Sequence, residues 1–307
     1  MAVITPDSLH SAQGSRRKMS AGFVSQPCCV TLSSMKALHA LLGVAALLFA
    51  AIPLLAANQV YIGFDRNVYP GDDALPILRK SFSFSGYWLS PPPGEKANGW
   101  TGKRALFKRY GFGFLLLYQS ATLSRIEDLS TAEKAGRADA QKASDAALRE
   151  GFPQHSVIFL DIEEGGRLSN PMHEYLRAWA RELNLRHFRP GVYCSGIPVD
   201  EGGGRSMVTA DDIRAHIAPL EISYWVYNDA CPPSPGCVLT PRGLTPAASR
   251  VSYASVWQFV RSPREKEVAS RCPGFASDDK CYFPLDTARR WHLDLDMAMS
   301  PDPSVPH

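Results

Sequence analysis

The sequence predicts an α/β fold, a (β/α)8 TIM-type barrel that becomes irregular, with few helices, after its sixth strand. Three observations predict it. Eight short apolar runs recur along the chain, helical patterns separate the early runs, and the whole covers about 240 residues, a size typical of such barrels. Most of the runs are continuous rather than alternating, as expected for parallel strands covered on both faces.

The expected strands are QVYIGFD (59–65), FSFSGYWL (82–89), FGFLLLYQ (112–119), SVIFLDIE (156–163), PGVYCS (190–195), ISYWVYN (222–228), SVWQFV (255–260) and WHLDLDMA (291–298). The expected helices are 75–79, 104–109, 132–150, 171–185 and 210–218. The connections 229–254 and 261–290 contain loops and cysteines instead of clear long helices. A doubly wound sheet is the alternative, but no glycine-rich phosphate loop follows the first strand.

Composition excludes some classes of function. The chain has 307 residues, of which 45% are hydrophobic and 21% charged, as in a globular protein with a substantial core. The formal net charge of +3 is small, and Lys and Arg are scattered without the basic stripe that nucleic-acid binding needs. We therefore expect no nucleic-acid partner. We expect a monomer, and nothing in the composition argues against one.

The first 57 residues read as a signal peptide with a long n-region, followed by the barrel at 58–300 and a disordered tail at 301–307. Met35 and Lys36 open the apolar run ALHALLGVAALLFAAIPLLAA, which ends in small residues near Ala57. A membrane anchor is the alternative, because the run approaches the roughly 20 residues that span a bilayer. A start at Met35 would give a conventional leader. We expect cleavage, no stable membrane insertion afterwards, and a secreted or periplasmic protein.

Cysteine usage agrees with an oxidising compartment. Cys231 and Cys237 bracket the turn-forming segment PPSPG, and Cys272 and Cys281 bracket a second polar loop. Two local disulfides are the expectation, although sequence alone leaves the connectivity open. Cys194 is expected to be a small buried hydrophobe. Metal binding is the rival interpretation of the cysteines, but there is no CxxC pair and no clustered histidine, so neither a metal nor a cofactor is expected.

Polar residues stand at the ends of several expected strands. Active sites of such barrels lie at the carboxyl ends of the strands, so these residues would share one rim. They are Asp65, Gln119, Asp161, Glu163, Asn228, Gln258, Asp294 and Asp296. A single case is ordinary capping, and Asp65 on its own could serve a turn or a salt bridge. The convergence of so many indicates a functional site.

The fourth strand carries two acids. Asp161 and Glu163 are two residues apart, so in a strand they project to the same side, about 6.6 Å apart along the chain. Glu164 would face the other way and is interpreted as structural. Crowded carboxylates raise at least one pKa, so that one group can hold a proton near neutral pH. Glycoside hydrolysis needs this arrangement, with one acid protonating the leaving oxygen and another carboxylate stabilising the cationic sugar or activating water.

The order GFD, FLDIEEG, GVYCS, YWVYND, VWQF and LDLDM resembles the glycoside-hydrolase-like TIM-barrel domain of unknown function, a family related to glycoside hydrolase family 25 lysozymes. The resemblance covers most of 59–298, and AGRADAQKASDAALREGFPQHSVIFLDIE resembles the first family in particular. It implies a barrel that loses its later helices. Asp296 departs from the Asn that is usual in the lysozymes, and YWVYND departs from their tryptophan–alanine pattern.

The resemblance implies roles for individual residues. Glu163 takes the proton-donor position with Asp161 as its partner, while Asp65 and Asp294 match the acids of the first and eighth strands. Further residues are implied to line the rim or bind substrate. They are Tyr118, Gln119, Tyr193, Trp225, Asn228, Trp257, Gln258 and Asp296. Trp225 and Trp257 could instead be core residues.

These observations predict an exported glycoside hydrolase-like protein that acts on a cell-wall polysaccharide such as peptidoglycan. Two alternatives stay open: a non-catalytic glycan-binding barrel, and a cell-envelope scaffold whose acids are remnants. The set of Asp65, Asp161, Glu163 and Asp294 favours an enzyme, because a binding module depends more on aromatic rings than on acids.

Overall fold

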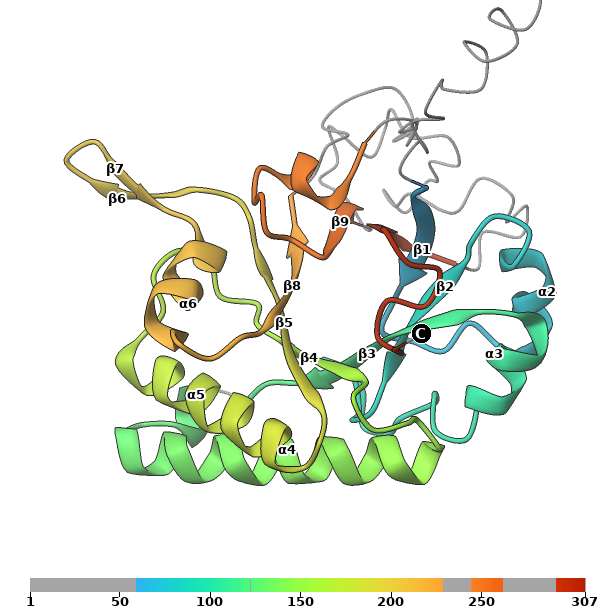
Figure 1. Cartoon of the computed structure of the whole chain (residues 1–307), viewed down its shortest axis with the longest axis horizontal. Coiled ribbons are helices and arrows are strands. Elements are labelled where there is room, and N and C mark those ends of the chain that lie inside the picture. Colours follow the sequence, from blue (N-terminus) through green and yellow to red (C-terminus); the bar gives the residue numbers. More distant parts are fainter. Residues whose placement is uncertain (1–58, 122, 229–243, 262–290, 307) are drawn as a thin grey trace, which may run out of the picture. The chain divides into compact units, whose positions relative to one another are not determined.

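Eight strands form a closed barrel in the computed structural model, which describes residues 59–121, 123–228, 244–261 and 291–306 (Figure 1). Their order around the barrel is β1, β10, β9, β8, β5, β4, β3, β2. The bounds are β1 (Tyr61–Asp65), β2 (Phe84–Trp88), β3 (Gly113–Gln119), β4 (Val157–Asp161), β5 (Arg189–Ser195), β8 (Ser223–Tyr227), β9 (Val256–Val260) and β10 (Asp294–Ala298). Each lies within or next to one of the eight predicted runs, so the predicted fold class is confirmed.

One strand runs against the prediction of parallel strands. β10 pairs antiparallel with both β1 and β9, while the other neighbouring strands of the barrel are parallel. An apolar run carries no information about its direction, which is why the sequence did not reveal this. Because β10 is reversed, its first residue, Asp294, lies opposite Asp65, the last residue of β1. The beginning of β10 therefore shares a rim with the carboxyl ends of the parallel strands.

The helices agree with the predicted ones to within a few residues. They are α2 (Leu75–Leu78), α3 (Arg104–Tyr110), α4 (Leu129–Glu150), α5 (Asn170–Leu185) and α6 (Thr209–Ile217), with 3-10 turns η2 (Asp72–Ala74), η3 (Leu123–Arg125) and η5 (Pro246–Ser249). In the described residues after β8, η5 is the one helical element. This agrees with the prediction of few helices after the sixth strand. Among the described segments, none of the helices has the length and apolar character needed to cross a bilayer.

The longest two helices, α4 and α5, lie side by side (Figure 1). Asp128 and Thr131 form a capping box that starts α4, and Gly151 ends it in the left-handed conformation that glycine adopts readily. Gly136 permits the close approach of the two helices, since a Cβ there would clash with the carbonyl oxygen of Tyr175. The buried face of α5, with Tyr175 and Trp179, packs as its helical spacing predicts.

A two-stranded hairpin of β6 (Val199–Gly202) and β7 (Arg205–Met207) was not predicted. It extends away from the barrel between β5 and α6 (Figure 1). Most of its residues are polar or glycine and exposed, and its apolar residues Val199 and Met207 stand singly, so no apolar run marked it.

The residues before the C-terminus are ordered against the barrel, so the predicted disordered tail is wrong for 301–306. Ser304 is fully buried, its N–H donates to the Phe114 carbonyl (2.9 Å), and its carbonyl accepts from the Val157 N–H (2.7 Å). Its hydroxyl accepts from the Leu116 N–H at 2.9 Å. The segment thus bridges β3 and β4 just before those strands begin to pair, at Leu116 and Ile158.

Cys194 is a free, fully buried thiol in β5, as predicted. The four cysteines of the predicted disulfides, Cys231, Cys237, Cys272 and Cys281, lie outside the described residues, as does the predicted signal peptide. The two disulfides and the leader therefore remain predictions.

Candidate active site

Two acids from opposite sides of the barrel mark its rim. Asp65 ends β1 and is 7% exposed, while Asp161 ends β4 and is 4% exposed. Both follow continuous apolar strands whose alternate residues point into the barrel. Gly86 of β2 provides room for Asp65, because a Cβ at that position would lie 2.7 Å from the Asp65 Cβ. The barrel therefore buries two carboxyl groups at its carboxyl end.

A hydrogen-bonded chain across three strands orients Asp65. The Gln258 side-chain amide on β9 donates to Asp65 Oδ2 at 2.8 Å, and its carbonyl oxygen accepts from the Tyr193 hydroxyl of β5 at 2.8 Å. Because the amide is held at both ends, its N–H faces the carboxyl group of Asp65. Gln258 is 1% exposed and Tyr193 8%, so water competes little for these bonds.

Glu163 stands at the solvent edge above Asp161. β4 ends at Asp161, so Glu163 lies just beyond the strand that was predicted to carry both acids, and it is exposed. The backbone nevertheless stays attached to β5, since the Ile162 N–H donates to the Tyr193 carbonyl at 3.0 Å. The two acidic side chains of the DIE sequence are close enough to interact.

Burial changes the acidity of the two rim acids. It raises the pKa of Asp161 well above its usual range, and the negative charges of Glu163 and Asp65 raise it further. Burial also raises the pKa of Asp65 to about 6, an effect that the Gln258 hydrogen bond opposes. The site therefore holds two neighbouring carboxyl groups that keep their protons to higher pH than free aspartic acid does.

A third buried carboxyl group lies deeper in the barrel. Asp296 of β10 is fully buried and accepts a 2.9 Å hydrogen bond from the Trp225 indole N–H. Burial, followed by the charge of Asp65, raises the pKa of Asp296 well above its usual range. Burial thus favours the neutral form of the Asp296 carboxyl group.

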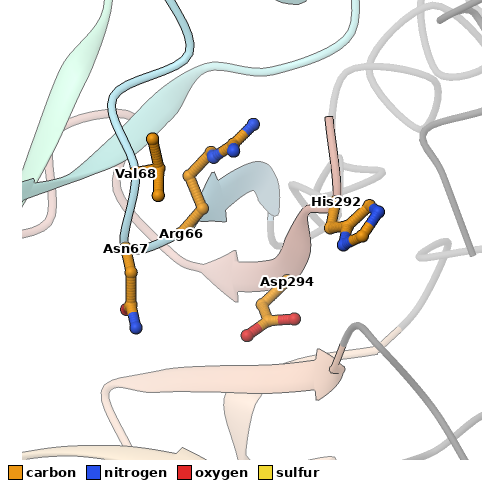
Figure 2. Close-up of a pocket in the computed structure, with 5 residues that line it drawn as sticks. All are labelled: Arg66, Asn67, Val68, His292 and Asp294. Atoms are coloured by element: carbon orange, nitrogen blue, oxygen red, sulfur yellow. The ribbon is translucent and has the colours of Figure 1, made fainter. Parts of the chain in front are cut away.

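A polar pocket opens at the rim between β1 and β10. It has a volume of about 200 Å³ and is lined by Arg66, Asn67, Val68, His292 and Asp294. Figure 2 shows Asn67 and Val68 on one side of it and His292 and Asp294 on the other. Since Arg66 directly follows Asp65, the pocket adjoins the buried acids. A polar ligand held here would lie next to the carboxyl cluster.

Several predicted rim residues have structural roles instead. The ring of Tyr118 packs on Trp179 of α5, with centroids 5.6 Å apart, so it faces the helices and not the barrel interior. Trp257 packs on Phe259, and its indole N–H donates to the Asn228 carbonyl at 2.8 Å. These two aromatic residues therefore lie on the outer face of the sheet.

Asn228 and Gln119 lie at strand ends, as predicted, with different surroundings. The Asn228 amide donates to the Ser249 carbonyl at 2.8 Å and ties β8 to the turn η5. Gln119 ends β3 and pairs with Asp161 in the register, so it lies beside the acid pair. Trp225 faces the barrel interior, where its ring lies against those of Phe159 and Tyr193.

Arg66 and Asn67, which follow β1 and line the pocket, are not among the predicted site residues. Arg66 and Asn67 lie in a polar segment, and the one signal that could have found them was their place directly after the rim acid of the first strand. Asn67 also accepts through its backbone carbonyl from the Trp100 indole N–H at 2.8 Å, which holds this segment in place. His292, which precedes β10, also lies near the rim and lines the pocket.

Part of the chain matches a known family model. Residues 96–228 match the family model of the Rv2525c-like, glycoside hydrolase-like domain, which confirms the resemblance predicted from the sequence motifs. That segment contains β3, β4, β5 and β8, and so Asp161, Glu163, Tyr193 and Trp225. No curated protein matches the chain.

Solved structures are similar in fold. An uncharacterized protein of B. stearothermophilus is 22% identical, with a TM-score of 0.50 over 78% of this chain and 95% of its own. The Mycobacterium tuberculosis Tat-secreted protein Rv2525c, solved in complex with L-tartrate, is 16% identical, with a TM-score of 0.46 over 79% of this chain and 96% of its own. GHIP, a glycosyl hydrolase 25 of Streptococcus pneumoniae, is 15% identical, with a TM-score of 0.44 over 80% and 89%. The first of these shows the common fold.

Proposed function

We propose that this protein is an exported glycoside hydrolase that cleaves glycosidic bonds of a cell-wall polysaccharide, with peptidoglycan as the best single substrate. The observation that carries the proposal is the arrangement at the rim: two buried carboxyl groups, Asp65 and Asp161, below an exposed one, Glu163. The glycoside hydrolase-like family match supports the reaction class. The lysozyme-like sequence motifs support the choice of substrate.

In this proposal Glu163 donates the proton to the leaving oxygen. It is the exposed member of the acid pair, so a polysaccharide lying on the rim reaches it first. Burial and then the charge of Glu163 raise the pKa of Asp161, so the neighbouring pair of Asp161 and Glu163 retains a proton more readily than an isolated carboxyl group does. In the proposed step this proton passes through Glu163 to the leaving oxygen, as general acid catalysis requires.

Asp65 and Asp294 supply the negative charge on the other side of the site. Their strands pair Asp65 with Asp294, so the two carboxyl groups enter the rim together. A carboxylate here stabilises the oxocarbenium-like charge that develops on the sugar. Gln258 fixes the orientation of Asp65, and the pocket beside Asp294 offers polar side chains to sugar hydroxyls.

The rival function, a non-catalytic glycan-binding module, is less well supported by the described residues. Such a module depends on exposed aromatic faces on which sugar rings stack. Within the described part of the barrel, Tyr118, Tyr193, Trp225 and Trp257 are at most 8% exposed. The rim offers acids where a binding module would offer rings.

The test is turnover on insoluble peptidoglycan and on a panel of soluble polysaccharides, with released reducing ends measured and products identified. Glu163→Gln keeps the shape but removes the transferable proton, so it should lower turnover roughly a hundred- to ten-thousand-fold. Glu164→Gln, one residue further along, is the matched control and should change turnover little. Thermal melts of both variants should stay close to that of the wild type.

Two outcomes would contradict the proposal in different ways. If Glu164→Gln abolishes turnover and Glu163→Gln retains it, the roles of the two acids are wrong. If the wild type binds a glycan tightly but releases no product from any substrate, the protein is a binding module.

A further inference from the structure

Two histidines and an aspartate gather between α5 and α6, away from the rim acids. His173 lies in the first turns of α5, and Asp212 and His216 lie four residues apart on α6, a spacing that puts them on one helix face. Each offers one ligand atom, and the three atoms lie within 4.8 Å of one another. The site is built from two helices whose packing brings it together.

Two members of the cluster, His173 and Asp212, are buried, and each has a polar atom that lacks a hydrogen bond. His173 Nε2 is 2.7 Å from Asp212 Oδ2, and His216 Nδ1 is 3.3 Å from Asp212 Oδ1. His173 is 3% and Asp212 1% exposed, yet His173 Nδ1 and Asp212 Oδ1 make no hydrogen bond. The imidazole rings stack with centroids 3.8 Å apart. Buried polar atoms without hydrogen bonds are rare in proteins, and a bound cation is one way to satisfy Asp212 Oδ1.

The local charge suits a cation. The Asp212 carboxyl group lies inside the cluster, within 3.3 Å of a nitrogen of each histidine. Arg167 Nη1 lies 3.5 Å from Asp212 Oδ1, but its guanidinium makes its shorter bonds to Glu201, at 2.8 and 3.1 Å. On the other side, Arg177 Nε donates to the His216 carbonyl at 3.0 Å and does not occupy the cluster.

We propose that His173, Asp212 and His216 bind a divalent transition-metal ion, with Zn²⁺ the best match for two imidazoles and one carboxylate. His216 is the partly exposed member, so it offers the ion an approach from solvent. Water would complete a tetrahedral site. Sequence spacing alone could not reveal this trio, because His173 and Asp212 are 39 residues apart.

The ion would act on the segment behind the rim. The Leu168 N–H donates to Asp212 Oδ2 at 2.9 Å, and Leu168 lies in the loop between β4 and α5, which also carries Glu163. An ion at Asp212 would therefore join α5, α6 and this loop into one unit. The proposal does not depend on glycoside hydrolysis, and its test measures metal binding.

The test uses the full chain, stripped with EDTA and titrated with Zn²⁺ by calorimetry, and with Co²⁺ by visible absorption. The wild type should bind an equivalent of metal that His216→Ala loses or binds at least roughly tenfold more weakly. Saturating Zn²⁺ should raise the wild-type melting temperature by several degrees, because the ion binds only the folded state. His216→Ala should lose that rise.

His155→Asn is the control, since this exposed histidine lies outside the cluster and has a positive φ of 64°, which Asn tolerates. It should bind metal as the wild type does. Circular dichroism would verify that His216→Ala is folded, as expected for a partly exposed side chain. No metal uptake by the wild type, or equal uptake and an equal rise in melting temperature in His216→Ala, would overturn the proposal and leave an ordinary His–Asp hydrogen-bonded cluster.

Discussion

The carboxyl group of Asp65 links stability to function at the scale of one residue. Burial raises its pKa from the ordinary 3.8 to about 6. A carboxyl group with a higher pKa in the folded protein contributes stability that is fully present below about pH 4 and is lost as the pH rises through about 6. We therefore expect the free energy of unfolding to fall between about pH 4 and pH 6, and Asp161 and Asp296 extend this fall to higher pH because burial raises their pKa values as well.

Asp65→Asn should raise stability and lower turnover, and so separate the two effects of this carboxyl group. The amide keeps the shape and can still accept from Gln258, but it has no charge to bury. At pH 7 the free energy of unfolding should rise by roughly 1–3 kcal/mol, while turnover should fall sharply because the stabilising negative charge is gone. Urea denaturation at pH 4 and pH 7, together with turnover, measures both. Near pH 4 the gain in stability should vanish.

Glu95→Gln provides the comparison, since Glu95 is exposed on a loop far from the buried acids in the sequence. Its free energy of unfolding should change by less than about 0.5 kcal/mol at either pH. A variant of Asp65 that is less stable than the wild type at pH 7 would show that the carboxylate is compensated in the folded protein and that its raised pKa is wrong.

The rim residues could be predicted only in part from the sequence. Asp161, Asp65 and Gln258 were found because each is polar directly after, or within, a continuous apolar run. Tyr118 and Trp257 were misplaced, because both faces of these strands are covered and an apolar run does not reveal which residues point inward. The side chains that a strand presents to the barrel interior depend on register, which the tertiary structure determines.

At the scale of elements, the strands and helices were predictable because their apolar patterns are long and regular. The direction of β10 was not predictable, since an apolar strand can pair with β1 and β9 in either direction. The β6–β7 hairpin was missed because it buries no apolar face. The C-terminal segment PDPSVP was missed because it has no periodic apolar pattern. It is attached to the barrel through hydrogen bonds, which such a pattern does not reveal.

Ser304→Ala tests that segment. The Ser304 hydroxyl is the acceptor for the buried Leu116 N–H, at the point where β3 and β4 begin to pair. Without it, a buried donor lacks a partner, so the free energy of unfolding should fall by about 1–3 kcal/mol. Ser206→Ala, on the exposed β7 strand, is the matched substitution and should have little effect. If both variants unfold at the same urea concentration as the wild type, the segment does not stabilise the barrel.

At the scale of the whole molecule, the order of the predicted leader and the barrel along the chain predicts where the protein is cleaved on export. The apolar run after Lys36 ends in small residues at Ala57, whereas β1 begins at Tyr61. Cleavage after Ala57 would leave all of β1, and Val60, which packs against the cluster of Trp257 and Met297, in the mature chain. The cleavage position is thus compatible with a complete barrel.

We therefore expect the exported protein to begin near Asn58. N-terminal sequencing of the protein from the culture medium or periplasm measures this directly, and changing Ala56 and Ala57 to Arg should block processing, because signal peptidases need small residues at the cleavage site. The barrel should fold in either case, since its first strand lies beyond the cut. Recovery of full-length wild-type protein in the membrane fraction would mean that the apolar run is an anchor, and the barrel would then act from the membrane surface.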